Sequence, residues 1–301
     1  MNVSELKNKF SLDGVLDITE AHSGFPFIKI NNQNASAVIS LYGGQVLSYA
    51  PHKADDLLFL SDKAFYQTGK AIKGGIPICW PWFGADPEGK GRPAHGFARN
   101  NLWELESTEQ TASGETKVVI SLLSNDVSKK LFPFEFKLSL TIVIGKELEL
   151  ELTTSNMDEK PFNITQALHT YFAVEDISGV AVLGLDGSSY LDKAKSNTGE
   201  ENRTQKGDVI FDGEVDRIYL DAPDNLQIQQ KNSVKLTGVK STNNKTVVVW
   251  NPWKELCEKS ADLKVDDYTR FVCVETANAA DDVIEIIPGE RFSLQVIYSI
   301  N

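Results

Sequence analysis

Hydrophobic and polar residues alternate along much of the chain, as they do in β-strands with one buried face. β-Branched and aromatic residues are concentrated in these stretches, which also favours strands. Helical periodicity is scarce. The pattern predicts six strands, over residues 118–123, 136–144, 162–174, 247–250, 271–274 and 292–300.

The clearest local unit is a hairpin over residues 138–152. Gly145-Lys146 separates two apolar runs, and a glycine at the first central position suits a two-residue type II′ turn. After the turn, glutamates at 147, 149 and 151 alternate with leucines at 148, 150 and 152. The pattern predicts antiparallel strands with one face in water and the other in a core.

One helix is predicted, with Asn251 as N-cap, Pro252 in the first turn and residues 253–263 as the body. Residues 196–207 form the most polar stretch and are expected to be an exposed loop. No repeat or low-complexity linker divides the chain. We therefore predict one all-β domain over residues 1–301, antiparallel, with few short helices.

Composition and charge exclude several classes of protein. The chain is 41% hydrophobic and 24% charged, typical of a folded protein, and its net charge of −12 disfavours general nucleic-acid binding. Its apolar runs are far shorter than the roughly 20 residues of a membrane span. The N-terminal residues do not resemble a secretory signal, so a cytoplasmic location is expected. The three cysteines form no CxxC pair, and no metal site is predicted.

Residues 74–99 read GGIPICWPWFGADPEGKGRPAHGFAR, a composition typical of a long shaped loop. Residues 70–99 carry a net charge of +3 on an otherwise acidic chain, so this segment could hold one anionic group, such as a sugar phosphate. Equally, scattered cations could simply solvate a loop. Trp80, Trp82 and Phe83 could offer flat faces to a sugar, although aromatic residues beside proline more often pack internally.

Two titratable residues stand out on predicted strands. His169 lies on the polar face of the strand predicted over 162–174, where a lone histidine is more often structural. Glu275 shares a strand face with Phe271 and Cys273, where partial burial would raise its pKa towards that of a useful base. A solvated strand-end glutamate is the alternative. Spacing alone does not show that the two residues meet, and it favours a surface ion pair for Asp216-Arg217.

Five sequence blocks carry a resemblance to a known family. They are GGIPICWPWFG at 74–84, PAHGFAR at 93–99, LHTYF at 168–172, DRIY at 216–219 and ETANA at 275–279. In this order they resemble the glucose-6-phosphate 1-epimerases of the aldose 1-epimerase superfamily. The resemblance implies a large antiparallel β-sandwich, the galactose mutarotase-like supersandwich. It also implies an isomerase that needs no cofactor and interconverts the anomers of a hexose 6-phosphate. A monomer is expected, although the sequence does not encode the oligomeric state in a readable pattern.

The resemblance also implies roles for individual residues. Glu275 would be the base that takes the C1 hydroxyl proton, and protonated His169 the acid that protonates the ring oxygen. Asp216 would bind the sugar, His95 would be a second active-site histidine, and Lys73 and Arg99 would bind the phosphate. Many relatives carry arginine where Lys73 stands, and some carry glutamine at the position of Ala94. Because lysine lacks the fork of arginine, either the phosphate is held less tightly or Arg92 binds it as well. A sugar-phosphate-binding protein without turnover is the alternative.

Overall fold

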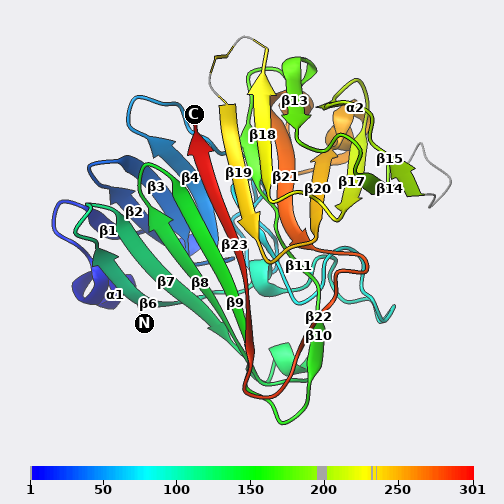
Figure 1. The fold of residues 1–301 in the computed structure, drawn as a ribbon. Helices are drawn as coiled ribbons and strands as arrows, with labels where there is room; N and C mark the ends of the chain where they lie inside the picture. The colour runs from blue at the N-terminus through cyan, green and yellow to red at the C-terminus, as the bar shows by residue number, and fades with distance from the viewer. Residues whose placement is uncertain (1, 195–201, 232, 235) are drawn as a thin grey trace.

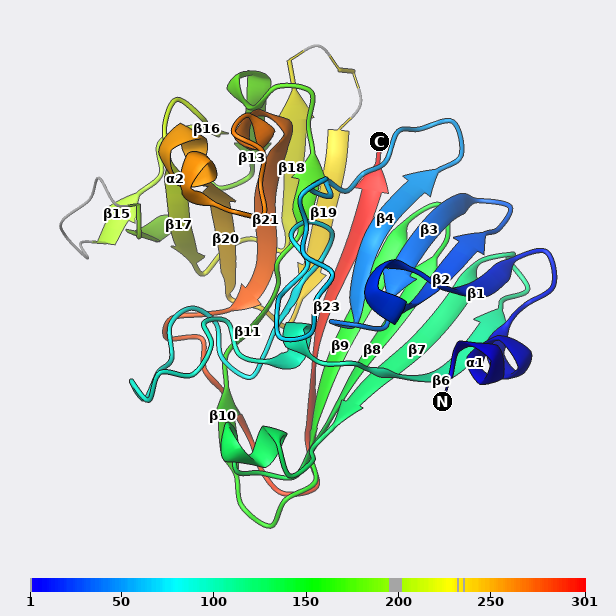
Figure 2. The ribbon, with the colours of Figure 1, turned by 180° about the vertical axis from the view of Figure 1, so that it is seen from behind.

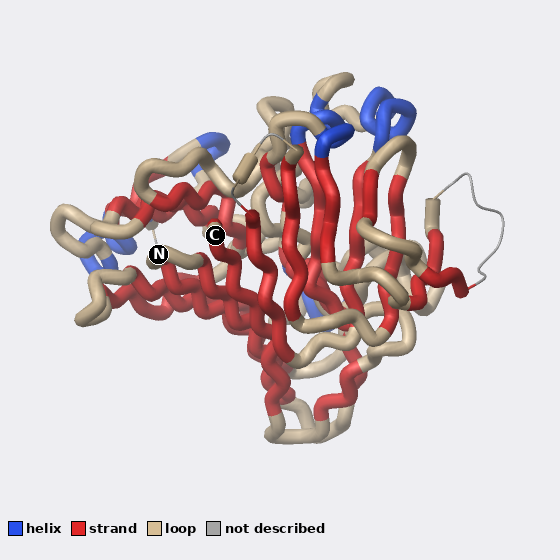
Figure 3. The backbone as a smooth tube through the Cα atoms, turned by 45° about the horizontal axis from the view of Figure 1, so that its top comes forward, coloured by secondary structure: helices blue, strands red, loops and turns tan. Residues whose placement is uncertain are grey.

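The computed structural model describes residues 2–194, 202–231, 233–234 and 236–301, and strands dominate it (Figure 3). Every ladder between its named strands is antiparallel, as the alternation pattern predicts. Over these described residues there are two α-helices, α1 (Val3–Phe10) and α2 (Trp253–Lys259). None of the described helices is long and apolar enough to span a membrane.

One sheet of nine strands forms a continuous layer. Its order is β16 (Val209–Ile210), β13 (Val180–Leu183), β18 (Asn225–Gln230), β19 (Leu236–Thr242), β23 (Arg291–Ile300), β9 (Leu148–Asn156), β8 (Phe136–Ile144), β7 (Thr116–Leu123) and β6 (Glu104–Gln110). The long C-terminal strand β23 lies in the middle of this layer and joins its two halves (Figure 1).

Two further sheets lie side by side against this layer (Figures 1 and 2). The four-stranded sheet holds β1 (Leu16–Glu20), β2 (Pro26–Asn31), β3 (Ala35–Ser40) and β4 (Gln45–Pro51) in chain order. The eight-stranded sheet holds β15 (Asn202–Thr204), β14 (Ser189–Asp192), β17 (Val215–Leu220), β20 (Thr246–Asn251), β21 (Phe271–Asn278), β11 (Gln166–Leu168) and β5 (Ile78–Cys79), with β12 (Tyr171–Ala173) also on β21. A small ladder pairs β10 (Phe162–Ile164) with β22 (Ile284–Ile286).

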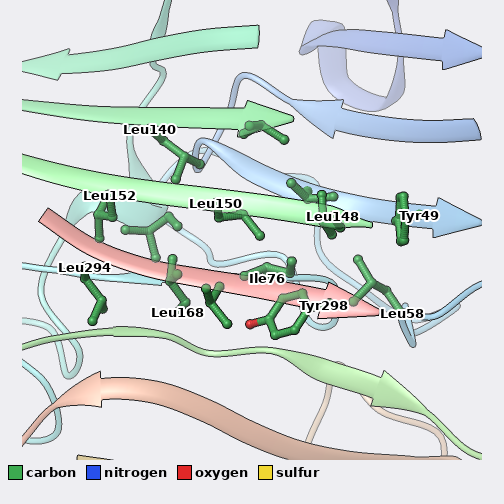
Figure 4. Packing of buried hydrophobic residues seen from close by; sticks show 14 of the residues in the cluster. Tyr49, Leu58, Ile76, Leu140, Leu148, Leu150, Leu152, Leu168, Leu294 and Tyr298 are labelled. Atoms are coloured by element: carbon green, nitrogen blue, oxygen red, sulfur yellow. The ribbon is translucent and has the colours of Figure 1, made fainter. Parts of the chain in front are cut away.

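The core lies between the layers. One cluster of buried side chains reaches from Leu6 in α1 to Tyr298 in β23, and Figure 4 shows its centre, where leucines of β8, β9 and β23 meet side chains such as Ile76 and Leu168. Fully burying such a side chain contributes about 1.5–3 kcal/mol. The all-β sandwich prediction is confirmed. The continuous cluster supports the prediction of a single domain, which stays a prediction.

The predicted hairpin is present, but its turn differs. Ile144 pairs with Leu148, so the loop has three residues, and the Gly145 N–H donates to the Glu147 carbonyl at 3.0 Å. Gly145 does not have the positive φ of a type II′ turn. Paired residues share a face of the sheet, so a two-residue loop would set Glu147 opposite Ile144 and turn it into the core. The longer loop leaves Glu147 exposed.

Five predicted strands are confirmed, within β7, β8, β20, β21 and β23. The predicted strand over 162–174 is instead three short strands, because the chain changes partners from β22 to β21 and β5 along it. The predicted helix ends at Lys259 rather than Leu263, and its N-cap is Pro252 rather than Asn251, although the Asn251 side chain accepts the Trp253 N–H. Of the predicted polar loop, residues 195–201 lie outside the described part, and residues 202–204 form β15.

Candidate active site

The loop that carries the GGIP motif holds His169 in place. The backbone N–H of His169 donates to the Pro77 carbonyl at 3.0 Å, and that of Tyr171 donates to the Gly75 carbonyl at 2.9 Å. Gly75 has φ +62°, and a Cβ there would lie 2.2 Å from the Val46 carbonyl oxygen, so only glycine allows this close approach. The link between β11 and β12 is thereby fixed against the loop, with the His169 ring stacked on Tyr171 at 4.9 Å.

His169 lies against Glu275, as the roles implied by the resemblance require. The Nε2 atom of His169 lies 3.3 Å from Oε1 of Glu275 on the neighbouring strand β21. Both side chains are buried, 8% and 1% exposed, respectively. The Nδ1 atom of His169 and the Oε2 atom of Glu275 have no hydrogen-bond partner in the described structure. Two buried polar atoms are therefore available to a bound molecule, since such atoms are normally satisfied.

The surroundings shift both pKa values towards the neutral forms. Burial, with His95 and the cations Arg99 and Lys73 nearby, places the pKa of His169 well below its usual value. Burial and the negative charge of Asp216 raise the pKa of Glu275 well above its usual value, against the opposing effect of Arg99. Both shifts favour a proton on the carboxyl rather than on the imidazole of the pair.

His95 completes a group of three titratable residues. Its ring centroid lies 5.9 Å from that of His169, and its Nδ1 accepts the Gly84 N–H at 3.3 Å. Burial, with Arg99 and Lys73 nearby, lowers its pKa to about 3. A neutral ring that accepts at Nδ1 carries its proton on Nε2, so His95 can donate a hydrogen bond at neutral pH.

Two cations lie beside this group, as their effects on both histidines show. Lys73, partly exposed, has its Nζ 3.6 Å from Asp262 Oδ2. Arg99 donates from Nη2 to the Ala94 carbonyl at 3.2 Å, while its buried Nε has no partner in the described structure. The arrangement can hold an anionic group next to the proton-carrying pair.

Asp216 reaches the site from β17. It pairs in register with Trp250, which pairs with Cys273, so the three residues share the face of the sheet that carries Glu275. Burial and the nearby Glu214 and Asp192 raise the pKa of Asp216 to about 6. Arg217 lies on the opposite face, with its guanidinium 4.9 Å above the Tyr190 ring, so the expected surface ion pair is absent.

The comparisons with known proteins agree with this geometry. The family model described as aldose 1-epimerase matches residues 26–299. The chain belongs to the aldose 1-epimerase family. A Cenchrus ciliaris protein named "putative glucose-6-phosphate 1-epimerase" is 37% identical over 276 residues, covering 89% of this chain and 82% of that protein. An Escherichia coli K12 protein of the same name is 37% identical, covering 84% and 83%.

Solved structures show the same fold for this epimerase. A Salmonella typhimurium protein described as a "putative mutarotase (YeaD)" superposes with a TM-score of 0.89 at 30% identity, covering 97% of this chain and 95% of that one. A galactose mutarotase related enzyme from Lactobacillus acidophilus shares the fold alone, with a TM-score of 0.73 at 15% identity. The supersandwich prediction and the isomerase class are thus confirmed.

Two predicted substrate-binding residues of the epimerase are engaged elsewhere. The Arg92 guanidinium, 8% exposed, donates to Asp86 and to the Leu131 carbonyl and pairs with Glu88 at 2.8 Å. It also lies 4.3 Å above the ring of Trp82, which is 4% exposed and donates to the Pro93 carbonyl. Trp82 has no free face for a sugar. Both side chains hold the loop together, so neither is available to a substrate.

Sequence reasoning about the epimerase singled out Phe83 but missed Trp250. Trp250, partly exposed, has its ring 5.9 Å from His169, and Phe83 lies 4.9 Å from His95. These two, with the stacked Tyr171, lie around the pair, whereas Trp80 is fully buried and donates to Thr154. Trp250 could have been found from the pairing register of β20 with β21. It pairs with Cys273, which lies two residues from Glu275.

Proposed function

We propose that this epimerase interconverts the α- and β-anomers of glucose 6-phosphate or a closely related hexose 6-phosphate, without a cofactor. The observation that carries the proposal is the buried His169–Glu275 pair, with Lys73 and Arg99 beside it. The names of the relatives at 37% identity support the same substrate class.

The pair suits the proton transfers of ring opening. An ionised Glu275 takes the proton from the C1 hydroxyl, while the His169 imidazolium protonates the ring oxygen O5 as the C1–O5 bond breaks. The electron pair of the O1–H bond forms the carbonyl, and the C1–O5 electron pair stays on O5. The open-chain aldehyde then faces a protonated Glu275 and a neutral His169. Rotation about C1–C2 and the reverse transfers close the ring with the opposite configuration.

Burial contributes to this cycle. Ring opening keeps one proton on the pair and only moves it from His169 to Glu275, so no net charge is gained or lost in a buried site. The shifts of both pKa values stabilise the form with a protonated carboxyl and neutral imidazole, which accompanies the open-chain sugar. The barrier to an otherwise uphill intermediate is thereby lowered.

The remaining residues position the substrate. Lys73 and Arg99 bind the phosphate, Asp216 accepts hydrogen bonds from sugar hydroxyls, and the Nε2–H of His95 donates to a substrate oxygen. Trp250 and Phe83 contact the apolar C–H faces of the ring. Lysine is a point charge without the fork of arginine, so Arg99 supplies the bidentate contact.

The test is exchange of the anomeric protons, followed by NMR on glucose 6-phosphate and on glucose. The wild-type protein should accelerate exchange, more strongly for the phosphate. Glu275→Gln should slow catalysis by roughly 10²–10⁴ and retain sugar-phosphate affinity. Since burial favours the neutral carboxyl of Glu275, the amide should fit with little loss of stability. Glu285→Gln, at an exposed position on β22, is the matched control.

A wild-type exchange rate equal to the spontaneous rate on several hexose phosphates would refute the proposal. Retained affinity without turnover in the wild-type protein would favour the alternative, a binding protein of the same fold.

A further inference from the structure

Cys273 has no part in the proposed reaction, yet it lies against the proton-carrying pair. Cys273 and Glu275 are two residues apart on β21, so their side chains emerge on the same face of the sheet. With His169 they place three different ligand atoms, a thiol sulfur, a carboxylate oxygen and an imidazole nitrogen, within 4.8 Å of one another. All three residues are buried.

The hydrogen bonding of His169 and Glu275 is incomplete. Their Nε2 and Oε1 atoms face each other at 3.3 Å, while the Nδ1 of His169 and the Oε2 of Glu275 have no hydrogen-bond partner within the described residues, although both residues are buried. Unsatisfied buried polar atoms are costly, and their presence together marks a place where a bound group would be favourable.

The donor set matches zinc in type and spacing. Zinc takes sulfur, nitrogen and carboxylate oxygen in tetrahedral sites, with Zn–N and Zn–O bonds of about 2.0–2.2 Å and Zn–S bonds of about 2.3 Å. Those bond lengths put nitrogen and oxygen about 3.4 Å apart, and nitrogen and sulfur about 3.6 Å apart. The His169–Glu275 separation of 3.3 Å already fits, and the distance from sulfur to nitrogen needs to shorten by about 1.2 Å at most, given bonds of that length.

The net charge of the zinc complex is also compatible with a buried site. Lys73 and Arg99 lie near the cluster and oppose any net positive charge there. A zinc ion bound by one thiolate, one carboxylate and one neutral imidazole makes a neutral complex, which adds no net charge to a buried site. The thiol and carboxyl protons are released to solvent on binding, and a water completes the tetrahedron.

We propose that His169, Cys273 and Glu275 form a binding site for Zn²⁺, and that the bound ion inhibits the epimerase because it occupies both proton-transfer groups. The site would make the enzyme sensitive to free zinc, in competition with the sugar. Binding of the ion stands on the geometry alone, whereas its inhibitory effect rests on the proposed function.

The binding test uses the full chain freed of metal, titrated with Zn²⁺ by calorimetry and with Co²⁺ by absorption spectroscopy. Wild-type protein should bind both ions, and the Co²⁺ form should show a thiolate-to-cobalt charge-transfer band. Cys273→Ser should abolish that band and weaken Zn²⁺ binding at least tenfold, about 1.4 kcal/mol. Cys257→Ser is the control, because Cys257 is also a buried free cysteine but lies outside the cluster. Cys273→Ala replaces the serine variant if the latter does not fold.

The inhibition test follows anomer exchange in each variant relative to its own metal-free rate. Zn²⁺ should slow the wild-type and Cys257→Ser proteins, with relief at high hexose phosphate, and should slow Cys273→Ser at least tenfold less effectively. Equal zinc affinity in wild type and Cys273→Ser, or a cobalt form without the thiolate band, would overturn the proposal. Thiolate-dependent binding in a protein that shows no metal-free exchange activity would instead refute the proposed function and leave the metal site standing.

Discussion

Lys73 Nζ lies 3.6 Å from Asp262 Oδ2, so the lysine assigned to the substrate phosphate already has an anionic partner. Asp262 follows α2 in the chain and contributes to the electrostatics of Tyr171, which places it at the edge of the site. A phosphate must therefore compete with this carboxylate for Lys73 and also approach its negative charge.

Asp262→Asn should lower KM for the hexose phosphate and leave KM for the neutral hexose unchanged. A partly exposed ion pair is worth about 0.2–1 kcal/mol, so the expected decrease in KM is on the order of 1.4- to fivefold. Anomer-exchange kinetics on both sugars measure it, with Asp281→Asn, an exposed aspartate, as control. In a Lys73→Met background, Asp262→Asn should lower KM for the hexose phosphate by a smaller factor. An equal decrease in KM in both backgrounds would show that Asp262 acts on the phosphate directly.

The two loop arginines should separate by phenotype. Arg92 is bound to Asp86, Glu88 and the Leu131 carbonyl, so Arg92→Met should lower Tm. The same variant should leave KM for the hexose phosphate within about twofold of wild type, as expected of a residue outside the binding site. Arg99→Met should raise that KM with a smaller effect on Tm. Thermal unfolding and exchange kinetics on both variants provide the comparison, and a large KM effect of Arg92→Met would restore it to the phosphate site.

The sequence predicted the strands whose burial alternates strictly. β8 and β9 have buried and partly buried residues in perfect alternation, and both were recognised from this pattern. The N-terminal strands were missed. In β3 the buried positions include Ala35 and Ala37, which are too small to produce a hydrophobic signal. Helix α1 was missed too, although its capping box of Asn2 and Glu5 was readable.

Prediction of the site was limited by long-range register. His169 and Glu275 were recognised separately, and the resemblance supplied their partnership, because residues 106 positions apart meet only through the pairing of β12 with β21. The strand is interrupted at residues 169–170, between β11 and β12. These residues include neither Gly nor Pro, so no local sequence signal predicted the interruption. Trp82 was chosen from composition, whereas Trp250 lies near His169 because of cross-strand pairing that composition does not encode.

The rate should depend on pH in a bell shape. The active pair carries one proton, which requires a pH above the lowered pKa of His169 and below the raised pKa of Glu275. Activity should therefore hold through the neutral range and fall on both sides. Because the charge of Asp216 raises the pKa of Glu275, Asp216→Asn should move the alkaline limb of kcat to lower pH. Exchange rates across pH 5–9 test this, and an alkaline limb that does not move would contradict the coupling.

Asp216 should lower the free energy of unfolding at pH values at which its carboxyl is ionised. Its pKa rises from 3.8 to about 6 on folding, so between these values the folded state binds more protons than the unfolded state. Stability from this group is full at low pH and is lost as pH rises towards 6. A rise of this size corresponds to about 3 kcal/mol as an upper bound. Asp216→Asn should therefore raise the free energy of unfolding at pH 8 and lose this advantage by pH 4, measured by urea unfolding at both pH values. An Asp192→Asn control should give a smaller gain, because Asp192 contributes less than burial to this shift. A gain for Asp216→Asn that is equal at both pH values would mean that the carboxylate charge is not its cause.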